Sequence, residues 1–188
     1  MRWLQGELEA AERGQVLRVV TAVVAAGGAV GWAQGATPAE LEAWLDERLA
    51  DASAGGCRHA AAADAAGVVQ AVGRWQWLTP QVRRRGAVVA QVMVHPSARG
   101  QGLARRVVTA LVGDARSAGV EQLVLEVRGN NHGAEALYRS LGFREAGVLA
   151  DAVAVGAERF DLVSYQLLLA LPDGVTRHGR RREGAGAT

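Results

Sequence analysis

The chain has 188 residues, of which 49% are hydrophobic and 21% charged, and its formal net charge is only +2. This composition is typical of a globular protein with one real core, and the small net charge argues against an extended basic surface for nucleic acid. Every basic residue is an arginine, and alanine, glycine and valine are abundant. We attribute this bias to GC-rich coding, so alanine-rich stretches carry less structural information than usual.

The cysteine content and the apolar runs of the sequence bear on the cellular location of the protein. Cys57 is the single cysteine, so it cannot form an internal disulfide, and secretion gains no support. Glu7 and Glu9 interrupt any apolar run that a signal peptide would need. Residues 19–33 are apolar but too few and too rich in glycine to cross a membrane. We therefore expect a soluble cytoplasmic protein in which Cys57 is structural.

The first third of the chain predicts a short strand followed by two helices. Residues 1–5 are the candidate strand, and residues 7–26 carry apolar side chains at helical spacing up to a pair of glycines. A loop at 28–35 follows. Thr37 and Glu40 then occupy the two positions of a capping box, so a second helix begins here. That helix should end before the next pair of glycines.

The rest of the chain alternates strands and helices. In order, we expect strands at 58–63, 68–78 and 87–94, a helix at 103–118, a strand at 122–127, a helix at 131–141, and strands at 143–149 and 161–169. The third of these strands is nearly all apolar, so both of its faces should be covered. One side of the second strand should hold Val69, Ala71, Gly73, Trp75 and Trp77. Residues 150–161 read as an exposed loop.

These elements predict one mixed α/β domain. No internal repeat or linker divides the chain, so we assign residues 1–171 to a single domain. Residues 172–188 hold an arginine run and lack apolar periodicity, so we expect a disordered tail. No metal site is expected, because the four histidines have no ligand spacing among them: His59, His95, His132 and His178.

A glycine-rich loop follows the 87–94 strand and opens the next helix, an arrangement that suits a phosphate group. Glycines let the backbone approach closely, and the free amides of the first helical turn point at the anion. A Walker loop requires a lysine, which this chain lacks, and a dinucleotide fingerprint requires glycine or alanine where Arg105 stands. The run from Arg99 to Ala104, RGQGLA, instead fits Q/R-x-x-G-x-G/A.

This loop resembles the acyl-CoA pyrophosphate loop of the GNAT acetyltransferase superfamily. Downstream, NHGAEALYRSLGF at 131–143 resembles the second signature of that family, N-x-x-A-x-x-L-Y-x-x-x-G-F, in matching order and spacing. The resemblance covers residues 68–169, and the N-terminal half is more loosely similar to tabtoxin-resistance-type members. It implies a mostly antiparallel sheet of about six or seven strands, flanked by about four helices and splayed between the fourth and fifth strands.

The resemblance also implies that acetyl-CoA, as the acyl donor, lies in the gap between those two strands. Main-chain groups of Met93 and Val94 would bind the pantetheine arm as an added strand does. Asn131 matches the family residue that contacts this arm, and it can also cap its own helix. The pyrophosphate would lie against the loop and the helix start, at Arg99, Gly100, Gln101, Gly102, Leu103, Ala104 and Arg105.

Two residues are candidates for proton transfer. Tyr138 matches the family residue whose phenol protonates the departing thiolate, although such a tyrosine can also simply pack in a core. Glu126 lies within the sequence LEVR, as does the proposed base of ribosomal-protein N-terminal acetyltransferases. Its apolar neighbours would raise the pKa of its carboxyl group, which suits a base. A structural pairing with Arg128 is the alternative. The fourth strand lacks the acidic residue of many relatives, which leaves a water chain, His95 or Asp151 open as the base.

The acceptor site is expected mainly in the first half of the chain. Trp32, Trp75 and Trp77 would wall it, although tryptophan more often lies in a core. The expected reaction transfers acetyl from acetyl-CoA to a primary amine of a small molecule within a ternary complex. The alternatives are acetylation of a protein N-terminus or side chain, acyl transfer from a carrier-protein thioester, and a non-catalytic acyl-CoA sensor. We expect no nucleic acid or membrane partner, and the resemblance is compatible with a homodimer.

Overall fold

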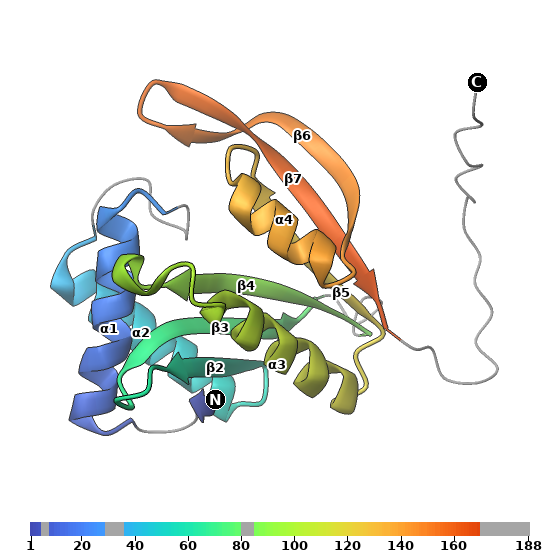
Figure 1. Ribbon diagram of the computed structural model, residues 1–188. Coiled ribbons are helices and arrows are strands. Elements are labelled where there is room, and N and C mark those ends of the chain that lie inside the picture. The colour runs from blue at the N-terminus through green and yellow to red at the C-terminus, as the bar shows by residue number, and fades with distance from the viewer. Residues whose placement is uncertain (5–7, 29–35, 80–84, 170–188) are drawn as a thin grey trace, which may run out of the picture.

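The computed structural model describes residues 1–4, 8–28, 36–79 and 85–169, and this part of the chain forms a seven-stranded sheet flanked by four helices (Figure 1). The strands are β1 (Arg2–Leu4), β2 (Cys57–Ala63), β3 (Val69–Trp77), β4 (Gly86–Val94), β5 (Gln122–Arg128), β6 (Arg144–Val155) and β7 (Glu158–Leu168). The helices are α1 (Ala10–Ala25), α2 (Pro38–Ser53), α3 (Leu103–Ser117) and α4 (His132–Ser140). The predicted fold class is confirmed.

The sheet has the order β1-β2-β3-β4-β5-β7-β6, and its strands are antiparallel except for the parallel pair β4 and β5. The predicted splay lies at this parallel pair. Gly86 pairs with Gln122 and Val88 with Val124, and no pairing between β4 and β5 continues beyond that point. The two strands therefore separate toward their C-terminal ends and leave a gap within the sheet.

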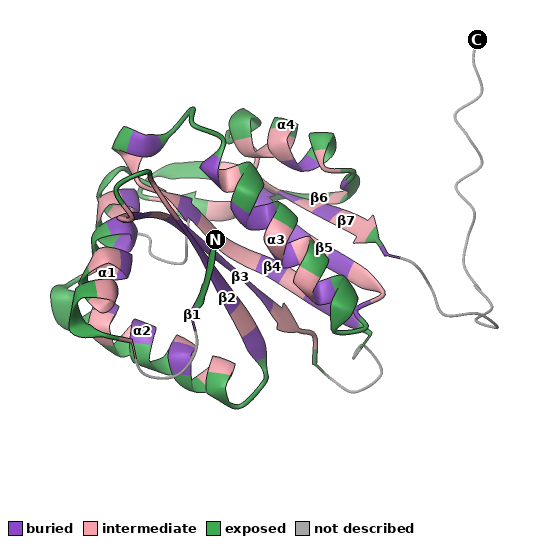
Figure 2. Cartoon of the chain, turned by 60° about the horizontal axis from the view of Figure 1, so that its bottom comes forward, coloured by how far each residue is buried: buried purple, intermediate pink, exposed green. Residues whose placement is uncertain are grey.

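The two faces of the sheet carry different helices (Figure 2). On one face of β1 to β4, α1 and α2 bury a core that includes Val20, Leu45 and Met93. On the other face, α3 and α4 bury a larger core that includes Leu111 and Leu125 and runs across β2 to β5 and β7. In the other half of the sheet, β5 and β7 contribute to this second core alone and β6 to neither core, so no helix of the described chain covers the opposite face of this half.

The start of α2 follows from its sequence. The Thr37 hydroxyl accepts a hydrogen bond from the amide of Glu40, and the Glu40 carboxylate accepts one from the amide of Thr37 at 2.7 Å. Both amides belong to a helix end that leaves them without an intrahelical acceptor. The predicted capping box is therefore formed. None of the helices in the described part of the chain is both long and apolar enough to cross a membrane.

The expected single-sided row on β3 is wrong at its first residue. Ala71 and Trp75 pack beneath α3, whereas Val69 packs on the opposite face with the α1–α2 core. The cause is a break in the register with β2, where Ala62 pairs with Ala71 but Ala63 pairs with Val69. An irregularity of this kind places one extra residue in a strand, so the side-chain alternation changes sides there.

The expected loop at 150–161 is also wrong, because β6 and β7 continue through it as a long hairpin. The two strands meet at a turn that contains Gly156, which has a positive φ of 57°. Pairing resumes after an irregularity between Leu149 and Val153, within which Asp151 also has a positive φ of 54°. The alanines and aspartates here have low strand propensity, so backbone pairing with β7 overrides what the side chains indicate.

Candidate active site

A cleft of about 430 Å³ opens where β4 and β5 diverge, and we call it the β4–β5 cleft. Its walls come from the end of α1 with Gly27 and Gly28, the last residues of β4, the start of α3, the end of β5 and one face of α4. Six of the residues expected to bind the donor or transfer protons line it, namely Met93, Val94, Arg99, Ala104, Asn131 and Tyr138. The two sequence motifs thus meet at one site although they lie on separate helices.

The glycine-rich loop forms the positively polarised end of the cleft. Gly100 and Gly102 have φ values of 78° and 73°, in the left-handed region that favours glycine. Gly102 is the N-cap of α3, and because glycine has no side chain, nothing of its own occupies the first amides of the helix. These amides and the helix dipole favour an anion at this position.

The side chains around this loop divide between cleft and core. Arg99 and Ala104 line the cleft, whereas Leu103 is buried in the core beneath α3. Arg105 donates a hydrogen bond of 2.6 Å from Nη2 to the Ser140 hydroxyl, which ties the start of α3 to the end of α4. Gln101 is exposed at the turn. The loop therefore offers backbone amides and the Arg99 guanidinium to the cleft.

Tyr138 lies on α4 with its side chain in the wall of the cleft and is only 8% exposed. Its ring packs edge-on against Phe143, with centroids 5.6 Å apart. Desolvation raises the pKa of the phenol to about 12. No partner of its hydroxyl is found within the described chain, and the raised pKa keeps the phenol protonated at neutral pH in the wall of the cleft.

Asn131 has two roles available from one position. Its side-chain oxygen accepts a hydrogen bond of 3.2 Å from the amide of Ala134, which caps α4. It also lines the cleft, together with Asn130 and Gly133. The cap fixes the side chain against the cleft wall, so capping does not exclude contact with a ligand there.

Glu126 has a different setting from the apolar one expected. Leu125 and Val127 are buried under α4, whereas Glu126 points to the uncovered face of β5 and is exposed. The alternative pairing with Arg128 is not formed, because that guanidinium contacts Asn130 and the carbonyl of Gly27. The sequence shows that one face of this strand is buried, but the cover of its other face depends on elements far away in the chain.

The other candidate bases lie outside the set of cleft-lining residues. His95 begins the 3-10 turn Pro96–Ala98, and its Nδ1 lies 2.8 Å from the Ser97 hydroxyl. Asp151 is exposed in β6, where its amide donates to the Asp161 carboxylate at 3.1 Å. Neither residue belongs to the walls of the β4–β5 cleft.

Two of the three tryptophans expected at the acceptor site lie outside the walls of the cleft. Trp75 is 2% exposed beneath α3, and its indole N–H donates to the carboxylate of Asp114 at 2.8 Å. Trp77 meets Trp75 edge to face, with ring centroids 5.3 Å apart. Both are on the sheet face that α3 covers, and neither lines the cleft. Trp32 lies outside the described residues.

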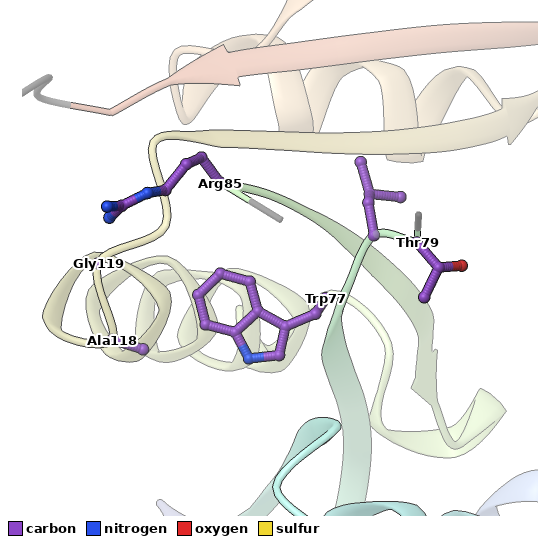
Figure 3. A pocket seen from close by; sticks show the side chains of 6 residues that line it. Trp77, Thr79, Arg85, Ala118 and Gly119 are labelled. Carbon is purple, nitrogen blue, oxygen red and sulfur yellow. The ribbon is translucent and has the colours of Figure 1, made fainter. Parts of the chain in front are cut away.

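Trp77 instead lines a separate hollow of about 460 Å³ near the far end of β3 (Figure 3). Figure 3 shows its indole beside the C-terminal end of α3, close to Ala118 and Gly119. Arg85 is the charged side chain in its described lining, and Arg85 pairs with Glu121 at 3.6 Å. The described residues of this hollow bring together no acid, base and nucleophile, so the β4–β5 cleft is the better candidate for chemistry.

Two features of the cleft were missed in the sequence. The end of α1 at Gly27 and Gly28 forms part of the wall, although the glycine pair reads from sequence as a simple helix stop. Arg128 lines the cleft from the end of β5. The alternation of side chains along the strand could have indicated this residue, because it places Arg128 on the same side of β5 as Glu126.

Comparison with known proteins identifies the family. The acetyltransferase (GNAT) family matches residues 29–143, more than half of the chain. The chain therefore belongs to this family and is an acetyltransferase, as the two motifs predicted.

Individual relatives differ in what they acetylate. An L-methionine sulfoximine/L-methionine sulfone acetyltransferase of Pseudomonas aeruginosa is 31% identical over 136 residues, which cover 71% of this chain and 77% of that protein. The ribosomal protein bS18 alanine N-acetyltransferase of Escherichia coli is 42% identical over 62 residues, which cover 33% of this chain and 42% of that protein. A phosphinothricin acetyltransferase from Sinorhizobium meliloti, solved with acetyl-CoA, has a TM-score of 0.74 at 20% identity and covers 92% of this chain and 91% of that chain.

Proposed function

We propose that this protein transfers the acetyl group of acetyl-CoA to a primary amine of a small molecule, by direct attack within a ternary complex. The observation that carries the proposal is the position of Tyr138, a buried and desolvated phenol in the wall of the cleft between β4 and β5. The opposite end of the same cleft has the free amides of α3, which suit a pyrophosphate.

The donor would occupy the cleft from the α3 end inward. Backbone groups of Met93 and Val94 would hydrogen-bond the pantetheine arm along the free edge of β4. Asn131 would contact the same arm from α4. The pyrophosphate would lie against residues 100–104. Arg99 would contribute positive charge from the cleft wall, and Arg105 would contribute it while hydrogen-bonded to Ser140.

In the reaction, the amine nitrogen attacks the thioester carbonyl carbon, a C–N bond forms and the C–S bond breaks. The departing thiolate takes the proton of Tyr138, which remains on the phenol at neutral pH because burial raises its pKa to about 12. The amine must lose a proton to a base. Glu126 is our candidate, and it would act through an intervening water because it lies on the open face of β5 outside the cleft wall.

The acceptor is proposed to be a small molecule because a relative that matches 71% of the chain is a methionine sulfoximine and methionine sulfone acetyltransferase. A second candidate is the N-terminus of a protein, as in the bS18 alanine acetyltransferase relative. The uncovered face of β5, β7 and β6 favours this second candidate, since an extended peptide needs such an open surface.

Substitution of Tyr138 by Phe tests the proposal. The ring keeps its contact with Phe143 and loses only the acidic proton, so we expect kcat to fall by about 10²- to 10⁴-fold with little change in KM for acetyl-CoA. The measurement is CoA release with amino acids, their sulfones and short peptides as acceptors, with thermal unfolding as the control for folding.

Two outcomes would contradict the proposal. Equal activity of wild type and Tyr138→Phe would remove the phenol from the mechanism. Tight binding of acetyl-CoA by the wild type without turnover of any amine would instead indicate a sensor of acyl-CoA.

A further inference from the structure

Arg128 presents a half-buried guanidinium to the β4–β5 cleft, and its orientation is fixed from three sides. Nε donates to the Asn130 side-chain oxygen at 2.7 Å, and Nη2 donates to the Gly27 carbonyl at 3.3 Å. The guanidinium carbon lies 4.9 Å from the centroid of the Phe160 ring. All three partners are neutral, so they orient the cation without balancing its charge.

No carboxylate of the described chain lies within ion-pair distance of Arg128. Arg13 and Arg48, which are also partly buried, do have such partners in Asp46 and Asp51. The buried Arg74 has none either, but it is enclosed away from the cleft and bonded to the side chains of Gln76 and Gln91. The sequence directly after Gly28, residues 29–35, contains no Asp or Glu either. A cation that is held in place without a counter-charge can accept an anionic ligand at little cost in reorganisation.

The unused donors of Arg128 form a site for two oxygens. Nε and one N–H of Nη2 are occupied, which leaves the N–H groups of Nη1 and the second N–H of Nη2. Adjacent guanidinium N–H groups match the spacing of the two oxygens of a carboxylate. The free edge of Arg128 is therefore suited to a bidentate anion.

Arg128 and Glu126 also lie on the same face of β5, two residues apart. Both side chains project from the face of β5 opposite Leu125 and Val127, so they are neighbours along the strand, although only Arg128 lines the cleft. Alternate residues of a strand lie about 7 Å apart. A ligand with an amine and a carboxylate on the same carbon is short enough to approach both groups at once.

We propose that Arg128 binds a carboxylate of the acceptor, so the substrates are amines that carry a carboxylate close to the reacting nitrogen, with α-amino acids and their analogues as the fitting class. This inference rests on the proposed function, because it assigns the acceptor of the same reaction. With its carboxylate on Arg128, the substrate would direct its amine toward Glu126, which would act on it through the intervening water.

Paired substrates test the proposal. L-methionine sulfone and 3-(methylsulfonyl)propan-1-amine share the side chain and the amine, and they differ in the carboxylate. Arg128→Gln should lower kcat/KM for the amino acid by about 10- to 100-fold, mainly through KM, because a charge-assisted hydrogen bond is lost. It should leave kcat/KM for the amine without carboxylate unchanged.

Two further variants separate binding from structure. Arg128→Lys keeps the positive charge but loses the bidentate geometry. Compared with Arg128→Gln, it should therefore recover part of the preference for the amino acid. Arg144→Gln removes an exposed arginine of β6 that does not line the cleft, and it should leave both substrates unaffected. Affinity for acetyl-CoA should be the same in all four proteins.

Three results would overturn the assignment of Arg128. These are equal use of both substrates by the wild type, an equal loss for both substrates in Arg128→Gln, and weakened binding of acetyl-CoA in that variant. Absence of turnover with every amine would overturn the proposed function instead. In that case calorimetric titration of the two amines into the CoA-loaded protein decides the inference: a carboxylate preference that disappears in Arg128→Gln upholds it, and equal binding overturns it.

Discussion

His59 on β2 is a buried imidazole in a cluster that carries positive charge. It is 8% exposed, and its Nε2 lies 3.3 Å from the sulfur of Cys57. Burial, then the charges of Arg74 and Arg48, lower the pKa of His59 to about 4. Burial also raises the pKa of the Cys57 thiol, so at neutral pH both groups are uncharged beneath α2.

This histidine should make folding sensitive to acid. In the unfolded chain His59 takes up a proton near pH 6.5, whereas in the fold it does so only near pH 4. The unfolded state therefore binds more protons in this window, and the free energy of unfolding falls as pH is lowered through it, by about 3 kcal/mol in total.

Urea titrations at pH 7, 6 and 5 measure this effect, with His59→Gln as the variant that lacks the titrating group. Carboxylates contribute equally to both proteins, so the difference in slope belongs to His59. The same pH dependence in both would show that the imidazole is not held neutral by the fold.

Motif residues could be placed from sequence, but their surroundings could not. Met93, Arg99 and Tyr138, which were expected at one acyl-CoA site, line the same cleft, and their roles there stay predictions. The exposure of Glu126 and the contact of Arg128 with Gly27 depend on packing between segments about 100 residues apart. Strand alternation alone gives the side on which a residue lies, and it does not give what covers that side.

The close packing of α3 on β3 depends on glycine at position 73. A Cβ at Gly73 would lie 2.7 Å from Cγ1 of Val107, and 3.3 Å from both Cδ1 of Leu111 and Cγ2 of Val92. The helix can therefore approach the strand closely only because glycine stands there. Gly113 on α3, by contrast, has no atom within 4 Å of an added Cβ.

Alanine at these two positions should have opposite effects. Gly73→Ala should destabilise the fold by about 1–3 kcal/mol, since Val107 and its neighbours must move. Gly113→Ala should stabilise it by up to about 1 kcal/mol, because alanine is the better helix former. Chemical denaturation of the two variants and wild type gives both values. Unaltered stability of Gly73→Ala would mean that α3 lies farther from the sheet.

Secondary structure was predictable wherever local chemistry specifies it. The capping box at Thr37 set the start of α2, and the apolar run of β4 was recognised within a residue of its bounds. The irregularity at Ala63 and the length of the β6–β7 hairpin were not recognised. Both depend on pairing with a neighbouring strand, and in alanine-rich segments the side chains carry little sign of it.

The whole molecule is a sheet of two halves joined along β4 and β5. The halves share the α3–α4 core, but their backbones pair at this line only from Gly86 to Val88 in β4. Beyond Val88, the β4 amides that face the gap have no partner in β5. Any ligand that enters the cleft would meet backbone groups that are still free to bond.

Acetyl-CoA should therefore stabilise the protein and do so locally. At a concentration of 100 times Kd, the free energy of unfolding should rise by about 2.7 kcal/mol. Hydrogen exchange followed by mass spectrometry should show slower exchange at the end of β4 and the start of α3, with β2 unchanged. Protection spread evenly over the sheet, or none at all, would argue against binding in the cleft.

The short pairing of β4 with β5 also determines how the sheet would respond to mechanical force. Backbone pairing between β2 and β3 runs from Cys57 to Ala63, and between β5 and β7 from Gln122 to Arg128. A pull that acts on β3 and β7 would therefore separate the sheet between β4 and β5, where fewer backbone pairs resist than between β3 and β4 or between β5 and β7. A donor bound across that line would raise the rupture force without altering the fold. The force needed to separate the two halves of the sheet would therefore report whether the enzyme holds its donor.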